Sequence, residues 1–249
     1  MIDLKNKVAI ITGGSSGIGE ATARELARLG VKVAVAARRK NKLDIIVSEI
    51  EAAGGVAMAV EADVTDKAVC QWLVKHVNDT WGKIDILINN AGVMLLGPVL
   101  DAPLQEWERM VHVNVLGLLY MTHAALPIMK KQGSGDIVNI SSVAGRTSRQ
   151  GSAVYNLTKW GVCAFTDALR QELANDKTGL RTILIEPGAV DTELISHNRA
   201  EVLDQVQARI GNIKRLAAED IAAGIVYAVS QPAHVSVNEV LIRPTAQVM

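Results

Sequence analysis

A phenol and an ammonium group lie four residues apart, at Tyr155 and Lys159, in a segment with helical character (152–177). Residues at this spacing stack on one face of a helix, so the two groups would share a site. Just upstream, the apolar run 136–140 predicts a buried strand that ends in the hydroxyls of Ser141 and Ser142. A tyrosine, a lysine and a serine could together transfer a proton without a metal or a histidine. The alternative is that Tyr155 and Lys159 only decorate an exposed helix face.

The ammonium would make the phenol a stronger acid. The pKa of a free tyrosine is about 10, and lowering it to near 7 requires about 4 kcal/mol. An ammonium about 4 Å away, at an effective dielectric constant near 20, contributes about that much. The spacing therefore predicts that Lys159 alone is about sufficient to acidify Tyr155.

A glycine-rich turn, from Thr12 to Gly19, follows the first apolar strand. It lies between a predicted strand (8–12) and a predicted helix (17–29), which is the setting in which such a turn binds a dinucleotide. Glycines permit positive φ and leave no Cβ in the path of a pyrophosphate, and the helix N-terminus adds N–H donors. The dinucleotide would lie at the switch point of the sheet, at its carboxyl edge. A tight turn that needs glycine only for its backbone is the alternative.

The end of the second predicted strand is basic, and residues 26–43 include no Asp or Glu. An acidic residue in this position usually binds the free 2′-hydroxyl of NAD. Arg38 could instead bind the 2′-phosphate of NADP by charge-assisted hydrogen bonds, which favours NADP over NAD; the alternative is a solvated basic loop. After the third strand, Asp63 and Val64 could reach the adenine, although Asp63 or Thr65 could equally cap the next helix.

Apolar strands and helical segments alternate along the chain. The predicted strands are 8–12, 31–36, 56–61, 84–89, 136–141, 181–186 and 239–242. The predicted helices are 17–29, 40–53, 66–81, 103–131, 152–177 and 218–230. Near-continuously apolar strands separated by helices indicate a parallel sheet covered on both faces. We therefore expect a single α/β domain over 1–249, a doubly wound parallel sheet (Rossmann fold) of about seven strands.

The composition argues against several classes of protein. Lys plus Arg and Asp plus Glu both number 26, and the net charge is 0, so nothing favours nucleic acid or an anionic membrane as a partner. No apolar run reaches membrane-spanning length and no signal peptide is present, so we expect a cytoplasmic protein. Cys70 and Cys163 are expected to be buried free thiols. The histidines lack a second ligand at metal spacing, so no metal is expected.

Six motifs, in order, resemble those of short-chain dehydrogenases/reductases over essentially the whole chain. They are the turn 12–19, Asn89-Asn90-Ala91-Gly92, Asn114, Ser142, Tyr155-x-x-x-Lys159 and Pro187-Gly188. The resemblance implies an NADP(H)-dependent oxidoreductase that transfers hydride between the nicotinamide and a carbonyl or secondary alcohol, with Tyr155 as general acid/base. It implies a catalytic tetrad of Asn114, Ser142, Tyr155 and Lys159, in which Ser142 rather than Ser141 lies at the family's distance before the tyrosine. In the family, the lysine also binds the nicotinamide ribose, and the asparagine holds a water that leads to that lysine. The charge of an oxidised nicotinamide would add to the effect of Lys159 on Tyr155.

The resemblance also implies a set of cofactor-binding residues. They are Gly13, Ser15, Ser16, Gly17, Ile18, Gly19, Arg38, Arg39, Asp63, Val64, Asn90, Ala91, Gly92, Tyr155, Lys159, Pro187, Gly188, Val190 and Thr192. Within the family, segments 94–99 and 238–245 look closest to NADPH-dependent reductases such as clavulanic acid dehydrogenase. The C-terminal segment departs from the glycine-rich tail of acyl-carrier-protein ketoreductases.

The resemblance also implies that the segment at about 188–216 closes over a small carbonyl or alcohol substrate. The candidate substrate contacts are Met94, Ser142, Tyr155, Leu194 and His197. Met94, like Leu95 and Leu96, could instead belong to the core, and His197 could be a solvated loop histidine.

Two other functions are compatible with these motifs: reduction of a β-ketoacyl thioester, and dinucleotide sensing without turnover. The long helices 103–131 and 152–177 carry apolar residues on more than one face, which suggests a partner subunit. The resemblance implies a homotetramer that uses these helices and the last strand.

Overall fold

A single parallel sheet organises the chain in the computed structural model, which describes residues 2–204 and 213–248. Within these residues the strand order is β3-β2-β1-β4-β5-β6-β7. The strands are β1 (Val8–Thr12), β2 (Lys32–Ala37), β3 (Val56–Glu61), β4 (Ile86–Asn89), β5 (Gly135–Ile140), β6 (Leu180–Pro187) and β7 (Glu239–Ile242). Every paired strand is parallel to its neighbour. The predicted α/β fold is therefore confirmed.

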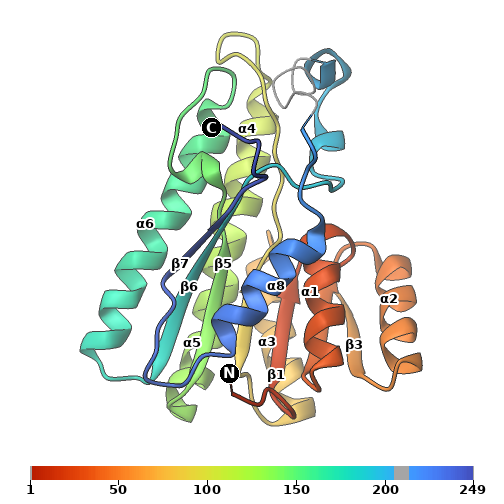
Figure 1. The fold of residues 1–249 in the computed structure, drawn as a ribbon, viewed down its shortest axis with the longest axis vertical. Helices are drawn as coiled ribbons and strands as arrows, with labels where there is room; N and C mark the ends of the chain where they lie inside the picture. Colours follow the sequence, from red (N-terminus) through yellow and green to blue (C-terminus); the bar gives the residue numbers. More distant parts are fainter. Residues whose placement is uncertain (1, 205–212, 249) are drawn as a thin grey trace.

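Helices cover both faces of this sheet (Figure 1). They are α1 (Gly17–Arg28), α2 (Lys40–Ala52), α3 (Lys67–Trp81), α4 (Leu104–Val111), α5 (Leu118–Gln132), α6 (Ala153–Asn175) and α8 (Ala218–Val229). One core packs α1, α2 and α8 against the sheet, and the other packs α3, α5 and α6 against the opposite face. The predicted ends of strands and helices lie within two residues of these bounds.

The strands are apolar throughout because successive side chains point to opposite faces, and both faces are covered. In β1, Ala9 and Ile11 belong to the core beneath α1, while Val8 and Ile10 belong to the core beneath α3. All four side chains are completely buried. A strand buried on both sides cannot show the alternation of a half-exposed strand, and the continuous apolar runs reflect this.

The long predicted helix 103–131 is interrupted in its middle. Between α4 and α5, the segment η1 (His112–Gly117) widens into a π-helix, a form that is rare and often found at functional sites. Asn114 is buried inside η1, and a Cβ on Gly117 would lie 2.7 Å from Val64 Cγ2, so the helix approaches the β3–α3 connection closely here. The predicted long helix is therefore present as one helical span, with a π-helical stretch of six residues that the sequence did not predict.

The helical span Leu104–Gln132 also differs from the expectation that no segment is long and apolar enough to cross a membrane. By length and composition alone this span passes that test, as core helices of soluble proteins also do. Its inner side packs on the sheet through Met121, Ala125 and Met129, which are fully buried.

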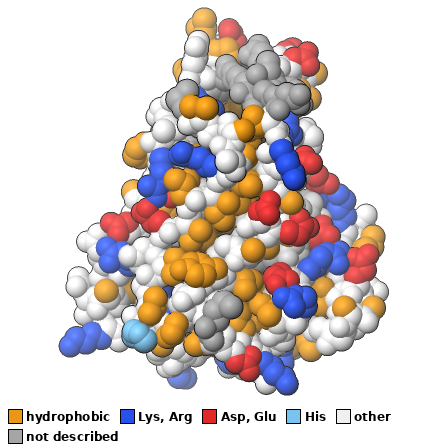
Figure 2. Space-filling model, viewed as in Figure 1, with side chains coloured by type: hydrophobic (Ala, Val, Ile, Leu, Met, Phe, Trp, Pro, Cys, Tyr) orange, Lys and Arg blue, Asp and Glu red, His pale blue; other side chains and the backbone are white. Residues whose placement is uncertain are grey.

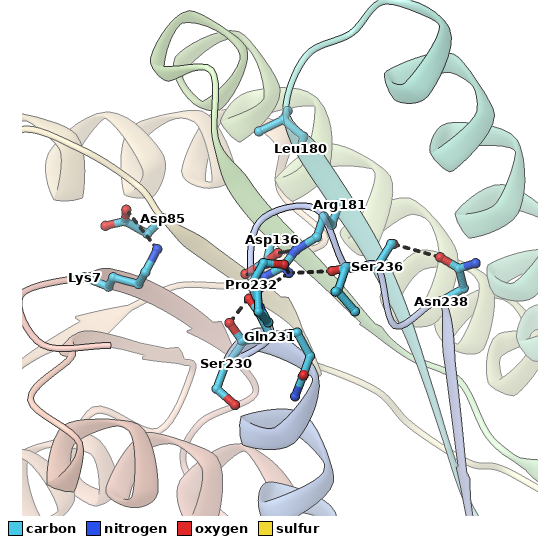
Figure 3. A network of polar contacts seen from close by, with 12 residues as sticks. Lys7, Asp85, Asp136, Leu180, Arg181, Ser230, Gln231, Pro232, Ser236 and Asn238 are labelled. Carbon is cyan, nitrogen blue, oxygen red and sulfur yellow. Dashed lines mark hydrogen bonds and ion pairs between the residues drawn. The ribbon is translucent and has the colours of Figure 1, made fainter. Parts of the chain in front are cut away.

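A buried ion-pair network ties the amino edge of the sheet together (Figure 3). The guanidinium of Arg181, on β6, donates from Nε and Nη2 to both oxygens of Asp136 on β5, at 2.6 and 2.9 Å. Its remaining N–H groups donate to the carbonyl oxygens of Val229, Gln231, Pro232 and Val235, at and after the end of α8. Burial raises the pKa of Asp136, and the hydrogen bonds from Arg181 oppose that shift. One side chain thus fastens two strands to the turn that precedes β7.

We expect Arg181→Lys to lower the free energy of unfolding by about 2–5 kcal/mol, because an ammonium cannot replace the planar set of donors and leaves buried carbonyl oxygens unpaired. Urea denaturation would measure this change. Arg170→Lys is the matched control, since Arg170 forms a half-exposed pair with Asp167 within one helix, and it should change stability by less than about 0.5 kcal/mol. A loss at Arg181 no larger than that at Arg170 would contradict the role of the network.

Candidate active site

The main cavity lies at the carboxyl edge of the sheet, where β1 and β4 lie side by side and the connections diverge to opposite faces. Its volume is about 530 Å³. The loops that surround it gather at the top of Figure 1, while the ion-pair network of Arg181 closes the opposite edge. The carboxyl side of such a switch point is where doubly wound sheets bind their ligands.

All but two of the residues predicted to bind cofactor or substrate, or to act in catalysis, line this cavity. The exceptions are Gly19 and Asn114, which lie behind its wall. A Cβ on Gly19 would meet Asn90 Nδ2 at 2.5 Å and Gly13 O at 2.6 Å. Gly19 is therefore required for the packing of the turn, and not for space in the cavity.

The glycine turn forms a cradle with its backbone exposed to the cavity. Gly13 and Gly17 have φ values of +65° and +56°, which L side chains rarely adopt. A Cβ on Gly13 would lie 2.7 Å from Ala91 Cα, so the β4 connection lies directly against the turn. The turn leads into the N-terminus of α1, where N–H groups and the helix dipole favour an anion. These features fit the pyrophosphate of a dinucleotide.

Thr12 and Asn90 hold the turn against β4. Thr12 Oγ1 accepts from the backbone N–H groups of Asn90 and Ala91, at 3.0 and 3.1 Å, and donates to Ile88 O. The Asn90 side chain donates to the carbonyl oxygens of Thr12 and Gly13. The role of Thr12 was not predicted; the β-branched residue directly before the glycines is the signal that could have indicated it.

The basic segment after β2 lies beside the glycine turn. Arg39 donates to Ser15 Oγ at 2.8 and 3.0 Å and to Ser16 Oγ at 2.7 Å, so the guanidinium holds both serines. Arg38 lines the cavity and is exposed, and it forms no hydrogen bond or ion pair with the described residues. Both arginines were predicted to bind the cofactor, with Arg38 proposed for the 2′-phosphate; in the structure Arg39 is the one that holds the glycine turn.

Asp63 does not cap the following helix. Its Oδ1 accepts from the backbone N–H and the hydroxyl of Thr65, which closes a local turn at the cavity wall. The cap of α3 is Asp66, which accepts from the N–H groups of Ala68 and Val69. The alternative that Asp63 or Thr65 caps α3 is therefore excluded. Asp63 and Val64 both line the cavity, and their contact with an adenine stays a prediction.

Tyr155, Lys159 and Ser142 meet on the inner wall of the cavity. The helix α6 presents Tyr155 and Lys159 on one face, and each side chain is only 6% exposed. Ser142 lies in the loop after β5, where its hydroxyl accepts from Ala144 N at 3.1 Å as the cap of the short helix η2 (Val143–Gly145). It lies close enough to the Tyr155 hydroxyl to lower the pKa of that group. The Lys159 ammonium donates to Ile140 O at 2.9 Å and lies 5.8 Å from the centre of the Tyr155 ring.

The pKa values of this pair differ from those expected. Burial raises the pKa of Tyr155 to about 12, against the lowering effect of the Ser142 hydrogen bond. Burial also lowers the pKa of Lys159 to about 8. The expectation that Lys159 alone acidifies Tyr155 is wrong, because the Coulomb argument left out the desolvation of both groups. Further positive charge near the phenol is required to lower the pKa of Tyr155 toward 7.

Asn114 is a buried linker between the cavity wall and α6. Its Oδ1 accepts from Val93 N at 2.8 Å, and its Nδ2 donates to Val93 O and to Thr158 Oγ1, at 2.9 and 3.2 Å. The cost of a buried amide is thereby removed. Gly92, next to Val93, faces both groups, since a Cβ there would lie 3.5 Å from Asn114 Oδ1 and 3.9 Å from Lys159 Nζ. A role for Asn114 in a proton route stays a prediction.

The Ser141 hydroxyl bonds to the backbone of α6 and to Cys163. It donates to Lys159 O at 3.1 Å and lies 3.3 Å from Cys163 Sγ. Both cysteines are free; Cys70 is buried, as expected, but Cys163 is only half-buried. The choice of Ser142 over Ser141 as the catalytic serine stays a prediction.

The outer part of the cavity is lined by the predicted substrate contacts Met94, Leu194 and His197. Val190 and Thr192, which precede Leu194 in the chain, also line the cavity. Residues 205–212 of the predicted substrate segment lie outside the described residues. Met94 is part-buried and packs against a small core cluster that includes Tyr155, so it belongs to both the core and the wall.

Two further lining residues were not predicted. Asn156 accepts from Ser152 Oγ and donates to the carbonyl oxygens of Ala144 and Thr147, which fixes the loop after Ser142. Its position next to Tyr155 was the only signal. Gln247, from the C-terminal tail, accepts from Ala189 N at 2.8 Å. No local pattern in the sequence indicates that this tail returns to the cavity.

Comparison with known proteins gives relatives along the whole chain. The profile of the family described as short chain dehydrogenase matches residues 7–203. An uncharacterized oxidoreductase of Staphylococcus epidermidis is 40% identical over 98% of this chain and 100% of its own length. Another, of Listeria monocytogenes, is 41% identical over 98% of each chain.

Two solved structures are similar in fold and sequence. A serine dehydrogenase in its closed form with NADP+ has a TM-score of 0.90 at 32% identity, over 97% of this chain and 96% of that one. A short chain dehydrogenase/reductase from Burkholderia phymatum in complex with NAD has a TM-score of 0.88 at 30% identity, over 97% and 90%. One of these two structures is thus a complex with NADP+ and the other a complex with NAD.

We expect Lys159→Met to raise the free energy of unfolding at pH 7 by about 1–3 kcal/mol, because it removes a desolvated ammonium. The pKa of Lys159 is lower in the folded state than in the unfolded state. The unfolded chain therefore binds the extra proton between about pH 8 and 10.5, and the wild type gains stability as the pH rises through this window.

The advantage of the variant should accordingly shrink toward pH 10, which urea denaturation at several pH values would show. Lys131→Met, at an exposed position of α5, is the control and should change stability little at any pH. A Lys159→Met difference that does not vary with pH would contradict the buried charge as its cause.

Proposed function

Because the chain belongs to the short-chain dehydrogenase/reductase family, we propose that it is an NADP(H)-dependent oxidoreductase acting on a small carbonyl or secondary alcohol. One observation supports this most strongly: the buried phenol of Tyr155 and the hydroxyl of Ser142 line the same cavity as the glycine cradle. A dinucleotide held by its pyrophosphate at the cradle and a substrate between Ser142 and Met94 would share this space.

NADP is proposed over NAD because the segment after β2 offers cations and no carboxylate. Arg38 lines the cavity without a partner among the described residues, and Arg39 lies between it and the two serines of the glycine turn. A guanidinium matches a phosphate by paired charge-assisted hydrogen bonds, whereas an acidic residue would be needed to bind a free 2′-hydroxyl.

The residues of this chain can carry the proton chemistry. When bound, the dinucleotide supplies the hydride and, in its oxidised form, a positive charge. Ser142 hydrogen-bonds to the substrate oxygen and orients it, and Tyr155 donates its proton to the alkoxide that forms in reduction. In the reverse direction Tyr155 accepts the proton. Lys159 and Asn114 hold the wall behind Tyr155, and Lys159 supplies the ammonium nearest to the phenol.

The burial of Tyr155 has a consequence for the direction of the reaction. With a pKa near 12 the phenol is fully protonated at neutral pH, which suits a general acid in carbonyl reduction. Oxidation needs the phenolate, and the positive charge of an oxidised nicotinamide would favour that form. The same residue can therefore act in both directions, with its charge state coupled to that of the cofactor.

We also propose that the protein is a cytoplasmic homotetramer. Large apolar side chains are exposed on two regions: Leu104, Leu157 and Trp160 on α4 and α6, and Tyr227 and Leu241 on α8 and β7. Figure 2 shows hydrophobic side chains gathered on the face where α8 and β7 lie. Two separate apolar surfaces would give a closed assembly with two kinds of contact. A sedimenting mass near that of a single chain would contradict this.

Tyr155→Phe should lower kcat by at least about 1,000-fold, because it removes the proton donor, while the Kd for NADPH stays within about threefold. The measurement is NADPH and NADH oxidation with a panel of free ketones and aldehydes and with a carrier-bound β-ketoacyl thioester. Tyr120→Phe, outside the cavity, is the matched control. Turnover only of the thioester would favour the β-ketoacyl reductase. A Tyr155→Phe variant that retains turnover would remove Tyr155 from the mechanism.

A further inference from the structure

The carboxylate of Glu193, in the segment after β6, forms ion pairs with two cations at the start of α2. Glu193 Oε2 accepts from Arg39 Nη1 at 2.7 Å, and Glu193 Oε1 accepts from Lys42 Nζ at 2.7 Å. The partners are 154 and 151 residues apart in the chain. These contacts therefore join the segment after β6 to the start of α2 across the cavity mouth.

The residues before and after Glu193 in the chain also line the cavity. Thr192, Leu194 and His197 line the cavity together with Glu193. Thr192 packs on the glycine turn, because a Cβ on Gly17 would lie 3.0 Å from Thr192 Cγ2. The position of the Glu193 carboxylate is thus linked to the wall that would contact nicotinamide and substrate.

The cations that hold Glu193 are those suited to a phosphate monoester. Arg39 and Lys42 present their N–H groups to two oxygens of one anion, and Arg38 stands next to them without an anionic partner among the described residues. Lys40, in contrast, is already paired with Asp44 on the same helix. Two cations thus hold one carboxylate, with Arg38 adjacent to Arg39 in the chain, and a phosphate dianion would satisfy these cations better.

We propose, on the basis of the NADP dependence proposed above, that Glu193 is a specificity-determining residue whose carboxylate occupies the place of the 2′-phosphate of NADP. Binding of NADP exchanges one anion for another on Arg39 and Lys42 and detaches Glu193 from them. NAD, which has no 2′-phosphate, leaves the Glu193 contacts intact. The residue therefore links cofactor identity to the position of the substrate segment.

The exchange is feasible because the Glu193 contacts are weak. Glu193, Arg39 and Lys42 are each about two-fifths exposed, and ion pairs of this exposure contribute little net stability. The two cations also lower the pKa of Glu193 to about 2, so it remains charged, and competes as an anion, at neutral pH.

The test compares Glu193→Gln with wild type in binding NADPH, NADH, adenosine 2′,5′-bisphosphate and 5′-AMP by calorimetry. Because it removes the competing anion, the variant should lower the Kd of NADPH and of the bisphosphate by about two- to fivefold. This factor corresponds to the free energy needed to displace an exposed ion pair. NADH and 5′-AMP should change by less than about twofold. Lys42→Gln should instead weaken NADPH and the bisphosphate.

Glu51→Gln is the matched control, because it makes the same change of charge at an exposed position of α2 and should leave all four affinities unchanged. If Glu193→Gln weakens the binding of all four ligands, or leaves the affinity for the bisphosphate unchanged, Glu193 is only a structural contact and the inference is overturned. Failure of the proposed function would be seen in the wild type itself, as NADH binding at least as tightly as NADPH.

Discussion

The burial of one phenol and one ammonium on the same face of α6 is the constraint on which the site depends. Desolvation moves both groups toward their neutral forms, so the pKa of Tyr155 rises and that of Lys159 falls. Two groups tuned in this way respond strongly to any charge brought into the cavity. In the proposed reaction, the charge state of Tyr155 would therefore be set by what binds in the cavity, because burial alone favours the protonated phenol.

The two edges of the sheet have different tasks. At the amino edge, Arg181 and Asp136 form a saturated network that fastens strands and turns. At the carboxyl edge, the side chains of Thr12, Asn90 and Asn114 form hydrogen bonds with backbone groups of the cavity wall. This second set leaves the cavity itself to Ser142, Tyr155 and the basic segment. The helix α6 positions Tyr155 and Lys159. The Glu193 carboxylate is held by exposed ion pairs, in a segment that is also fastened by Asn198, which accepts from Leu96 N, and by Gln247, which accepts from Ala189 N.

The sequence was sufficient to predict the sheet, its helices and the grouping of the glycine turn with Tyr155 and Lys159, because these follow from local periodicity and from strand ends that share one edge. It was not sufficient where the outcome depends on contacts between distant segments. The contact of Glu193 with Arg39, the return of Gln247 to Ala189 and the widening of η1 have no local signature. The pKa of Tyr155 was predicted in the wrong direction because burial cannot be read from the spacing to Lys159.

The most direct test of this account is the ionisation of Tyr155 followed by ultraviolet difference absorbance, with Tyr155→Phe subtracted to remove the other two tyrosines. Without a dinucleotide, we expect no Tyr155 phenolate below about pH 10, because burial holds the pKa near 12. With saturating NADP+, the ionisation should move down by at least about two pH units, since a positive charge enters a site of low dielectric constant. An ionisation that is the same with and without NADP+, or that already lies near pH 7 in the protein alone, would contradict the account.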